Sequence, residues 1–338
     1  MLFSVNGYTE WREKRMSTIK DVAKLAGVSV ATVSRVLNKN GYVHEDTLKK
    51  VERAIEMLDY KPSTVARSLY NKKSRLIGLV VPNIVNPFFP EVARAVEDVA
   101  HKQGYTVVLC NSDESLEKEK QYIDVLRQNN VDGFIVATNP QNSVNYMNLS
   151  VPVVAIDRMF NERIPAVYAD NYAGSQAATK LLIDKGCKHI AHIRGPRDVS
   201  TANERFEGFV DVITQNNLSY MIAESTFDPA NSERVAVELL EEYPHIDGIV
   251  AGNDLIAIGI VKAALQKGIS IPDDLQIIGF DGISLTEMMY PSITTVAQPI
   301  YEMGKVATEL LLEQMEGNVL EEKHYRLPIE IIERNTTK

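Results

Sequence analysis

Apolar residues recur at two different spacings along this chain of 338 residues, and the spacing changes near residue 75. Before that point they recur every three or four residues in two short blocks, Val22, Leu25 and Ala26 and then Val33, Val36 and Leu37. Beyond it, short apolar runs alternate with amphipathic stretches. The pattern therefore predicts a small all-α head followed by a larger α/β body.

The head is predicted to begin with two short helices within residues 18–38, joined by a tight turn at 27–29. Gly27 can adopt the positive φ that a sharp turn needs, and Ser29 can cap the second helix through its hydroxyl. A third helix is predicted from about 45 to 58. This pattern is typical of a helix-turn-helix, which places its second helix in the DNA major groove. An ordinary helical hairpin is the alternative.

A hinge is predicted at residues 62–75, after a head that spans 16–61. Pro62 ends the preceding helix, and Ser63 can cap a short new one. One or two turns of helix are marginal alone in water, so we expect this segment to become ordered on a partner. A plain linker is the alternative. Residues 1–15 are predicted to be a disordered extension.

The body is predicted to contain buried strands at 76–82, 105–110, 133–138, 151–157, 189–193, 221–223, 248–252, 275–281 and 325–334. Helices are predicted at 87–102, 115–129, 172–185, 203–216, 232–243 and 254–267. Apolar strands that alternate with helices indicate parallel sheets covered on both faces, and the two series predict two lobes. We expect an N-terminal lobe of 76–171 and 300–323 and a C-terminal lobe of 172–299 and 324–338. Ligands of such folds bind beyond the carboxyl ends of the strands.

The net charge changes where the pattern changes. Residues 16–75 contain twelve Lys or Arg against six Asp or Glu, a net charge of +6, and residues 1–15 add +1. The whole chain has a net charge of −9, which leaves −16 for residues 76–338. A basic head on an acidic body is expected of a protein that contacts phosphate groups through its head alone.

The composition argues against several other classes of protein. Cys110 and Cys187 show neither metal-ligand spacing nor a disulfide pattern, so we expect a reducing cytoplasm. No apolar run is long enough to span a membrane, and residues 1–15 lack the apolar stretch of a signal peptide. The six histidines have no metal spacing, and the common phosphate-binding and nucleophile motifs are absent. We therefore expect no enzyme activity, no cofactor and no metal.

The head and hinge resemble the lactose-repressor (LacI) family of bacterial transcription regulators. The segments TIKDVAKLAGVSVATVSRVLN (18–38) and PSTVARSL (62–69) are highly specific to that family, and the likeness covers essentially the whole chain from Met16. The resemblance implies a homodimer on a palindromic operator and a body similar to periplasmic sugar-binding proteins. It also implies a hinge helix in the minor groove, with Leu69 as a wedge between base pairs beside Arg67. The chain leaves no length for a C-terminal heptad helix after 325–334, so we expect dimers rather than tetramers.

The resemblance also assigns the DNA contacts. Residues that read bases are expected directly after the turn and one helical turn further on: Val30, Ala31, Thr32 and Arg35. Apolar side chains contact thymine methyl groups, whereas arginine donates hydrogen bonds to guanine. The remaining DNA contacts are expected mainly from hydroxyl groups that reach phosphates: Thr18, Ser29 and Ser34, together with Asn38.

Side chains at strand ends and helix starts in the body resemble those that surround the sugar in ribose-binding proteins. They are Asn86, Phe88, Phe89, Asp157, Arg158, Arg205, Phe227, Asn253, Asp281 and Gln298. Aromatic rings cover the apolar faces of a pentose, while Asp, Asn, Arg and Gln pair with its hydroxyl groups. The resemblance implies a small sugar effector between the lobes, with D-ribose favoured and another pentose or a hexose as alternatives.

These residues also have structural interpretations. NPFF at 86–89 fits helix entry and core packing, Asp281 fits a strand-end cap, and Arg205 fits an ion pair with a nearby carboxylate. The leading prediction is a repressor that a sugar releases from its operator, although the resemblance alone leaves the sign of the effect open. Two alternatives remain: a catabolite regulator with a phosphorylated carrier protein as corepressor, and a sugar-binding protein without a DNA function.

Overall fold

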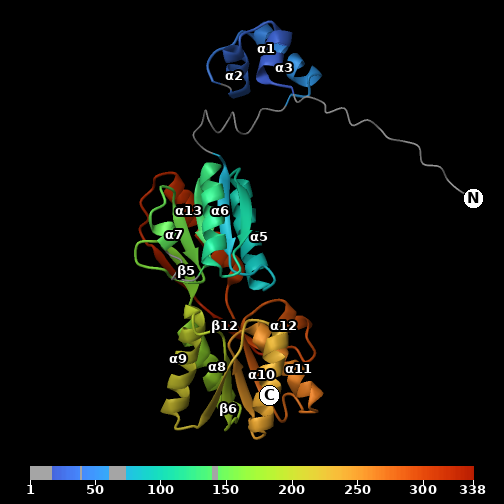
Figure 1. Cartoon of the computed structure of the whole chain (residues 1–338), viewed down its shortest axis with the longest axis vertical. Coiled ribbons are helices and arrows are strands. Elements are labelled where there is room, and N and C mark those ends of the chain that lie inside the picture. The colour runs from blue at the N-terminus through green and yellow to red at the C-terminus, as the bar shows by residue number, and fades with distance from the viewer. Residues whose placement is uncertain (1–16, 39, 61–73, 139–143) are drawn as a thin grey trace, which may run out of the picture. The chain divides into compact units, whose positions relative to one another are not determined.

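The computed structural model describes residues 17–38, 40–60, 74–138 and 144–338 (Figure 1). The chain divides into two compact units, of which the first ends at Ser74 and the second begins at Arg75. The predicted extension at 1–15 and the predicted hinge contacts of Arg67 and Leu69 lie outside the described residues.

The first unit contains three helices among its described residues: α1 (Ile19–Ala26), α2 (Val30–Asn38) and α3 (Glu45–Met57). Gly27 has a φ of 68° and ends α1, as the turn requires. Val22, Val33 and Val51, one from each helix, are fully buried against one another in a single cluster. Leu25, expected on the apolar face of the first helix, is instead 51% exposed.

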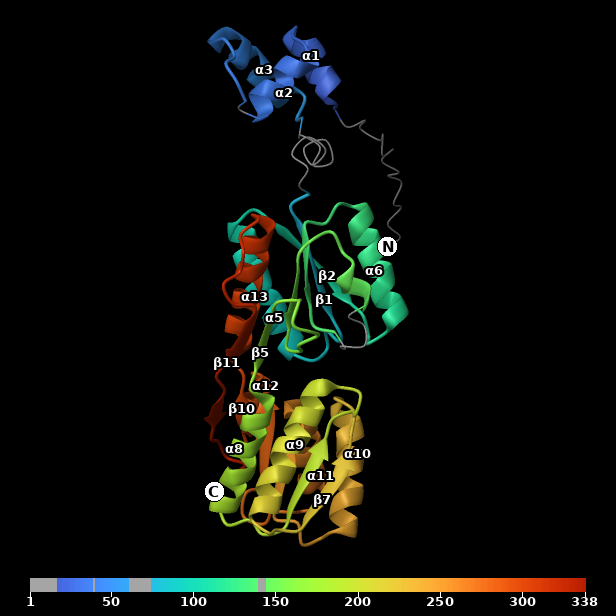
Figure 2. The same cartoon turned by 90° about the vertical axis from the view of Figure 1, so that its left-hand side faces the viewer.

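The N-terminal lobe of the body is built on a six-stranded parallel sheet in the order β11-β5-β4-β3-β1-β2. Its strands are β1 (Leu76–Val81), β2 (Thr106–Asn111), β3 (Gly133–Val136), β4 (Val153–Ile156), β5 (Ala166–Ala169) and β11 (His324–Leu327). Helices α5 (Phe88–Lys102) and α13 (Ile300–Met315) pack on one face. The other face packs against α6 (Leu116–Gln128) and α7 (Val144–Met147), as Figure 2 shows for α5, α13 and α6.

The C-terminal lobe repeats this plan with the order β12-β10-β9-β8-β6-β7. Its strands are β6 (Ile190–Arg194), β7 (Tyr220–Glu224), β8 (Gly248–Ala251), β9 (Gln276–Asp281), β10 (Thr294–Ala297) and β12 (Glu330–Ile332), of which β12 is antiparallel. Helices α10 (Pro229–Glu242) and α11 (Asp254–Gln266) pack on one face, and α8 (Asn171–Asp184) and α9 (Ser200–Gln215) on the other. A short helix, α12 (Leu285–Met288), follows β9.

The chain passes between the lobes three times: between β5 and α8, between β10 and α13, and between β11 and β12 (Figures 1 and 2). The third crossing corrects two predictions, a single strand at 325–334 and the assignment of 324–338 to the C-terminal lobe. β11 pairs with β5 in the N-terminal lobe, and only β12 pairs with β10 in the C-terminal lobe. Pro328, which has no N–H to donate to a ladder, lies in the gap between the two strands.

Candidate functional site

The second helix of the head, α2, carries the residues predicted to read bases. Val30, Ala31, Arg35 and Asn38 are exposed, whereas Thr32 and Ser34 are half-buried. Ser29 caps this helix, because its Oγ accepts a hydrogen bond from Thr32 N at 3.1 Å. The cap fixes where the helix begins and therefore which side chains its first turn presents.

The side chains predicted to contact phosphates already have local partners. Thr18 forms a capping box with Asp21, whose carboxylate accepts a hydrogen bond from Thr18 Oγ1 at 2.7 Å. Ser34 Oγ accepts a hydrogen bond from Asn38 Nδ2 at 3.3 Å. These bonds stabilise α1 and α2, so Thr18, Ser34 and Asn38 have a structural role that does not depend on DNA.

A shallow surface pocket lies beside α2 and includes residues that the sequence did not single out. Its lining consists of Val28, Ser29, Thr32 and Arg35 together with the further residues Tyr42, Val43, His44 and Thr47. Tyr42 is 88% exposed. An exposed aromatic side chain in a basic head is the signal that could have identified these further residues.

In the body, the predicted sugar residues converge on one cavity between the lobes. Its lining consists of nine predicted residues and one further residue: Asn86, Phe88, Phe89, Asp157, Arg158, Arg205, Phe227, Asn253 and Asp281, with Thr201. Thr201 lies in the first turn of α9, four residues before Arg205, and that helical spacing is the signal that could have found it. Gln298 does not line the cavity, but its Nε2 donates to Asp281 Oδ1 at 2.8 Å.

The elements of both lobes position these side chains at strand ends. Asp157 and Arg158 directly follow β4, and Asp281 ends β9. Phe88 and Phe89 open α5, and their rings meet edge to face with centroids 5.1 Å apart. Asn253 caps α11, since its Oδ1 accepts from Ile256 N at 2.9 Å. The local rules of strand ends and helix caps thus bring polar groups to the facing edges of the two sheets.

Arg205 is the most constrained side chain of the cavity. Its Nη2 lies 3.0 Å from Asp281 Oδ1, and its Nε and Nη1 donate to Asn171 Oδ1 and Gly252 O at 2.8 and 2.7 Å. The guanidinium carbon also lies 3.8 Å from the centroid of the Phe280 ring. The predicted ion pair with a carboxylate is therefore present, and it faces the cavity.

Arg158 bridges two carboxylates at the N-terminal lobe. Its Nη1 donates to Glu114 Oε1 at 3.1 Å, and its Nε lies 3.5 Å from Asp157 Oδ2. Burial raises the pKa values of both Asp157 and Asp281, and the neighbouring arginines lower them by less. The cavity is therefore a buried, nearly balanced arrangement of carboxylates and guanidinium groups that suits an uncharged polar ligand.

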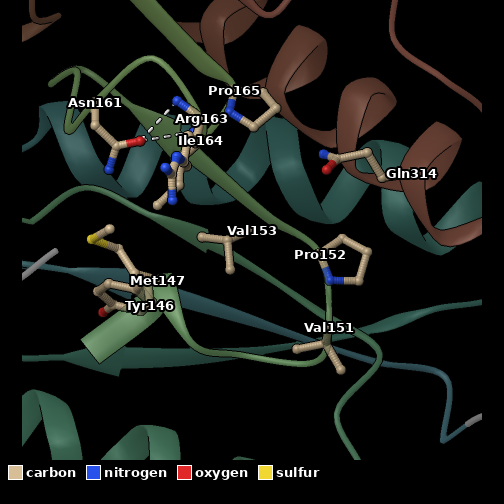
Figure 3. Close-up of a pocket in the computed structure, with 10 residues that line it drawn as sticks. All are labelled: Tyr146, Met147, Val151, Pro152, Val153, Asn161, Arg163, Ile164, Pro165 and Gln314. Carbon is tan, nitrogen blue, oxygen red and sulfur yellow. Dashed lines mark hydrogen bonds between the residues drawn. The ribbon is translucent and has the colours of Figure 1, made fainter. Parts of the chain in front are cut away.

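A second pocket lies on the N-terminal lobe, between α7 and the end of α13 (Figure 3). Its volume is about 220 Å³, and Pro152, Val153 and Pro165 contribute much of its apolar wall. Asn161 Oδ1 accepts hydrogen bonds from Arg163 N and Ile164 N at 2.8 and 3.2 Å, which shapes its rim. It contains none of the residues predicted to bind a ligand, so the interlobe cavity remains the candidate effector site.

Two structural findings bear on alternative functions. In the described part of the chain, no helix is both long and apolar enough to span a membrane. Within the same residues, no group of three or more His, Cys, Asp or Glu side chains is placed to hold a metal ion.

A helix-turn-helix head joined to a two-lobed body with a polar cavity defines a class of ligand-controlled DNA-binding proteins. The chain belongs to the LacI family. Residues 18–63 match the family model of bacterial regulatory proteins of the lacI family. Residues 74–335 match the model of periplasmic binding proteins and the sugar binding domain of the LacI family. The protein is therefore a DNA-binding transcriptional repressor rather than an enzyme, and its partners are operator DNA and a sugar effector.

Several relatives match over nearly their whole length. The chain is 52% identical over 323 residues to the ribose operon repressor of Halalkalibacterium halodurans, covering 96% of this chain and 98% of that protein. It is 43% identical over 324 residues to the ribose operon repressor of Bacillus subtilis, covering 96% and 99%.

Similar crystal structures match either nearly the whole chain or a large part of it. The Lac repressor dimer bound to operator and the anti-inducer ONPF matches with a TM-score of 0.85 and 26% identity, covering 95% of this chain and 99% of that one. A LacI family regulator from Enterococcus faecium with bound ribose matches with a TM-score of 0.71 and 31% identity, covering 78% and 98%.

Proposed function

We propose that D-ribose is the effector and that it binds in the interlobe cavity and releases the repressor from its operator. The similarity to ribose operon repressors and to a regulator crystallised with ribose supports this choice. The cavity residues would act as predicted, with Phe88, Phe89 and Phe227 against the apolar faces of the sugar. Its hydroxyl groups would pair with the amide, carboxylate and guanidinium groups.

One observation supports a hydroxylated ligand more directly than the others. Arg158 lines the cavity, and its Nε is a buried donor that has no hydrogen-bond partner among the described residues. Leaving such an atom unsatisfied costs about 1–3 kcal/mol. Sugar hydroxyl groups can accept a hydrogen bond, so a bound pentose could satisfy this donor.

The lobes must separate for this ligand to enter. The cavity volume is about 30 Å³, well below the roughly 300–1,000 Å³ of typical small-molecule pockets. Entry of a pentose therefore requires movement at the three crossings between the lobes. In our proposal the lobes then close around the sugar, and this closure shifts the N-terminal lobes of a dimer and melts the hinge at 62–75, so that the heads lose their register on DNA.

On the DNA side, Val30, Ala31, Thr32 and Arg35 would read base edges, and Thr18, Ser29, Ser34 and Asn38 would contact the backbone. Arg67 and Leu69 would enter the minor groove. We propose a homodimer on a palindromic operator, as in the Lac repressor dimer. The exposed apolar side chains Val85, Met288 and Tyr290, from both lobes, offer area for such an interface.

Calorimetric titration of the full chain with D-ribose tests the proposal. Fructose, glucose and a purine base are the controls, the last because PurR repressors of Aliivibrio fischeri are 38% identical to this chain. We expect saturable heat with ribose alone, at one site per chain. Heat with a purine base and none with ribose would overturn the assignment of the effector.

The catabolite-control alternative makes the opposite prediction in the same experiment. A regulator that takes a phosphorylated carrier protein as corepressor would show no heat with any sugar, and the carrier would retain it on an affinity column. Weaker operator binding in the presence of ribose would support induction, whereas tighter binding would reverse the proposed sign.

A further inference from the structure

The charged side chains around the interlobe cavity form ion pairs with one another. Arg205 is paired with Asp281 at 3.0 Å, and its remaining bonds go to Asn171 and Gly252. Arg158 lies between Asp157 and Glu114. Both guanidinium groups therefore have carboxylate partners that balance their charge, although Nε of Arg158 makes no hydrogen bond within the described residues.

Glu114 differs from the other carboxylates because it lies outside the cavity lining. It is in the loop between β2 and α6, its side chain is 39% exposed, and it contacts the buried guanidinium of Arg158 from the solvent side. With Glu114, the local set contains three carboxylates and two guanidinium groups. Without it, the charges of the lining residues are equal in number, and Nη1 of Arg158 has a hydrogen bond to offer.

We propose that Glu114 is a specificity-determining residue that occupies Arg158 and thereby excludes phosphorylated sugars from the cavity. A phosphate group carries a charge of about −1.5 to −2 at neutral pH and needs charge-assisted donors, which Arg158 would otherwise supply. In a closed, low-dielectric site the repulsion between a phosphate and the surplus carboxylate is strong. The repressor therefore responds to the free sugar and not to its phosphate esters.

A neighbouring pocket reinforces this selectivity. It shares Asp157 with the cavity and is also lined by Asp170, Glu204 and Arg326, of which Arg326 is paired with Asp170 at 3.1 Å. The side of the cavity beyond Asp157 is thus negative as well. An anionic sugar meets no unpaired cation in the described residues of either pocket.

The inference rests on the proposed sugar site, and calorimetry can separate the two. The full-length wild type, Glu114→Gln and Glu117→Gln are titrated with ribose, ribose 1-phosphate and ribose 5-phosphate. Methyl riboside and 5-O-methyl ribose are their neutral counterparts, because each carries an uncharged methyl group at the position of one phosphate. Glu117 is the matched control, because it is exposed at the start of α6, bonds to Ser115 and contributes the same charge.

We expect the wild type to bind each phosphate at least about 100-fold more weakly than its neutral counterpart. Glu114→Gln should improve binding of one phosphate at least about tenfold, namely the one whose phosphate faces Arg158, and change ribose affinity less than about threefold. Unchanged ribose binding also shows that the variant is folded. Glu117→Gln should match the wild type.

Three results would overturn the inference and leave the ribose site intact. They are equal binding of a phosphate and its neutral counterpart by the wild type, equal exclusion of the neutral ethers, and unchanged discrimination in Glu114→Gln. A wild type that binds ribose but shows the same gain in Glu117→Gln would also overturn it. If the wild type binds no sugar at all, the proposed function itself fails.

Discussion

Asp254, the first residue of α11, fixes the backbone directly after β9, the strand that ends with Asp281 at the cavity. Its Oδ2 accepts hydrogen bonds from Gly282 N and Ile283 N at 2.7 and 2.8 Å, and its Oδ1 lies 2.6 Å from the Thr295 hydroxyl. A Cβ at Gly279 would lie 2.2 Å from Asp254 Oδ1, so glycine is needed there to make room for the carboxyl group. The position of Asp281 therefore depends on a residue that does not touch the cavity.

The protonation of Asp254 should make the stability of the body depend on pH. Burial, and then the negative charge of Asp281, raise the pKa of Asp254 above its ordinary value, so folding favours the protonated form. The resulting stability is complete below the pKa of the unfolded chain, near pH 4, and is lost as pH rises through the raised pKa. In Asp254→Asn, Oδ1 can still accept the two N–H groups and Nδ2 can donate to Thr295.

As pH rises from about 5 to about 9, we therefore expect the wild type to lose unfolding free energy relative to Asp254→Asn. Urea unfolding of both proteins across this range measures it. Glu117→Gln serves as a control for the loss of an exposed carboxylate. Parallel pH profiles for Asp254→Asn and the wild type would show that Asp254 is ionised throughout.

Residues of the cavity could be predicted from the sequence where a local rule places them. Asp157, Asn253 and Asp281 follow or end apolar runs, and parallel strands bring such ends together. Glu114 and Asp254 could not be assigned in this way, because their roles depend on contacts with residues 44 and 41 positions away in the sequence. Charge alone gives no sign of such a partner.

At the scale of elements, α2 is fixed by signals within a few residues. Gly27 ends α1, and Ser29 begins α2. Both are local, which is why the head could be predicted closely. The exposed side chain of Arg35 then projects from a helix whose start is fixed by a cap, and this is the arrangement that base reading requires.

Replacement of Arg35 should weaken operator binding and relax its sequence preference. We expect Arg35→Ala to cost about 1–3 kcal/mol on the operator and to reduce discrimination at one base pair of each half-site. Lys50→Ala, which removes an exposed positive charge from α3, is the matched control and should weaken binding equally on all sequences. Fluorescence anisotropy on a panel of single-base operator variants measures both effects. Uniform weakening by Arg35→Ala would assign Arg35 to the DNA backbone.

The sequence pattern did not predict β5, and it merged β11 with β12 into one strand at 325–334. β5 and β11 have four residues each, and they pair with one another in the N-terminal lobe. The pattern did not predict α13 either, although Met303, Ala307 and Leu310 recur at helical spacing and are buried against the N-terminal lobe. Pattern alone therefore predicted the alternation of the body but not how its last strands divide between the lobes.

At the scale of the whole molecule, the DNA-binding unit and the sugar-binding unit are coupled only if ribose and operator favour different forms of the body. Such coupling is reciprocal, so the factor by which ribose weakens operator binding must equal the factor by which operator weakens ribose binding. We expect a factor of about 5–150 in both directions, measured by anisotropy with saturating ribose and by calorimetry with saturating operator.

Asp281→Asn should bind operator normally and lose the response to ribose, because the variant lacks the charge that holds Arg205. Arg35→Ala should bind ribose normally, since its substitution lies in the separate first unit. Loss of both activities in either variant would contradict a modular repressor, and unequal factors would show that one titration measures a process other than binding.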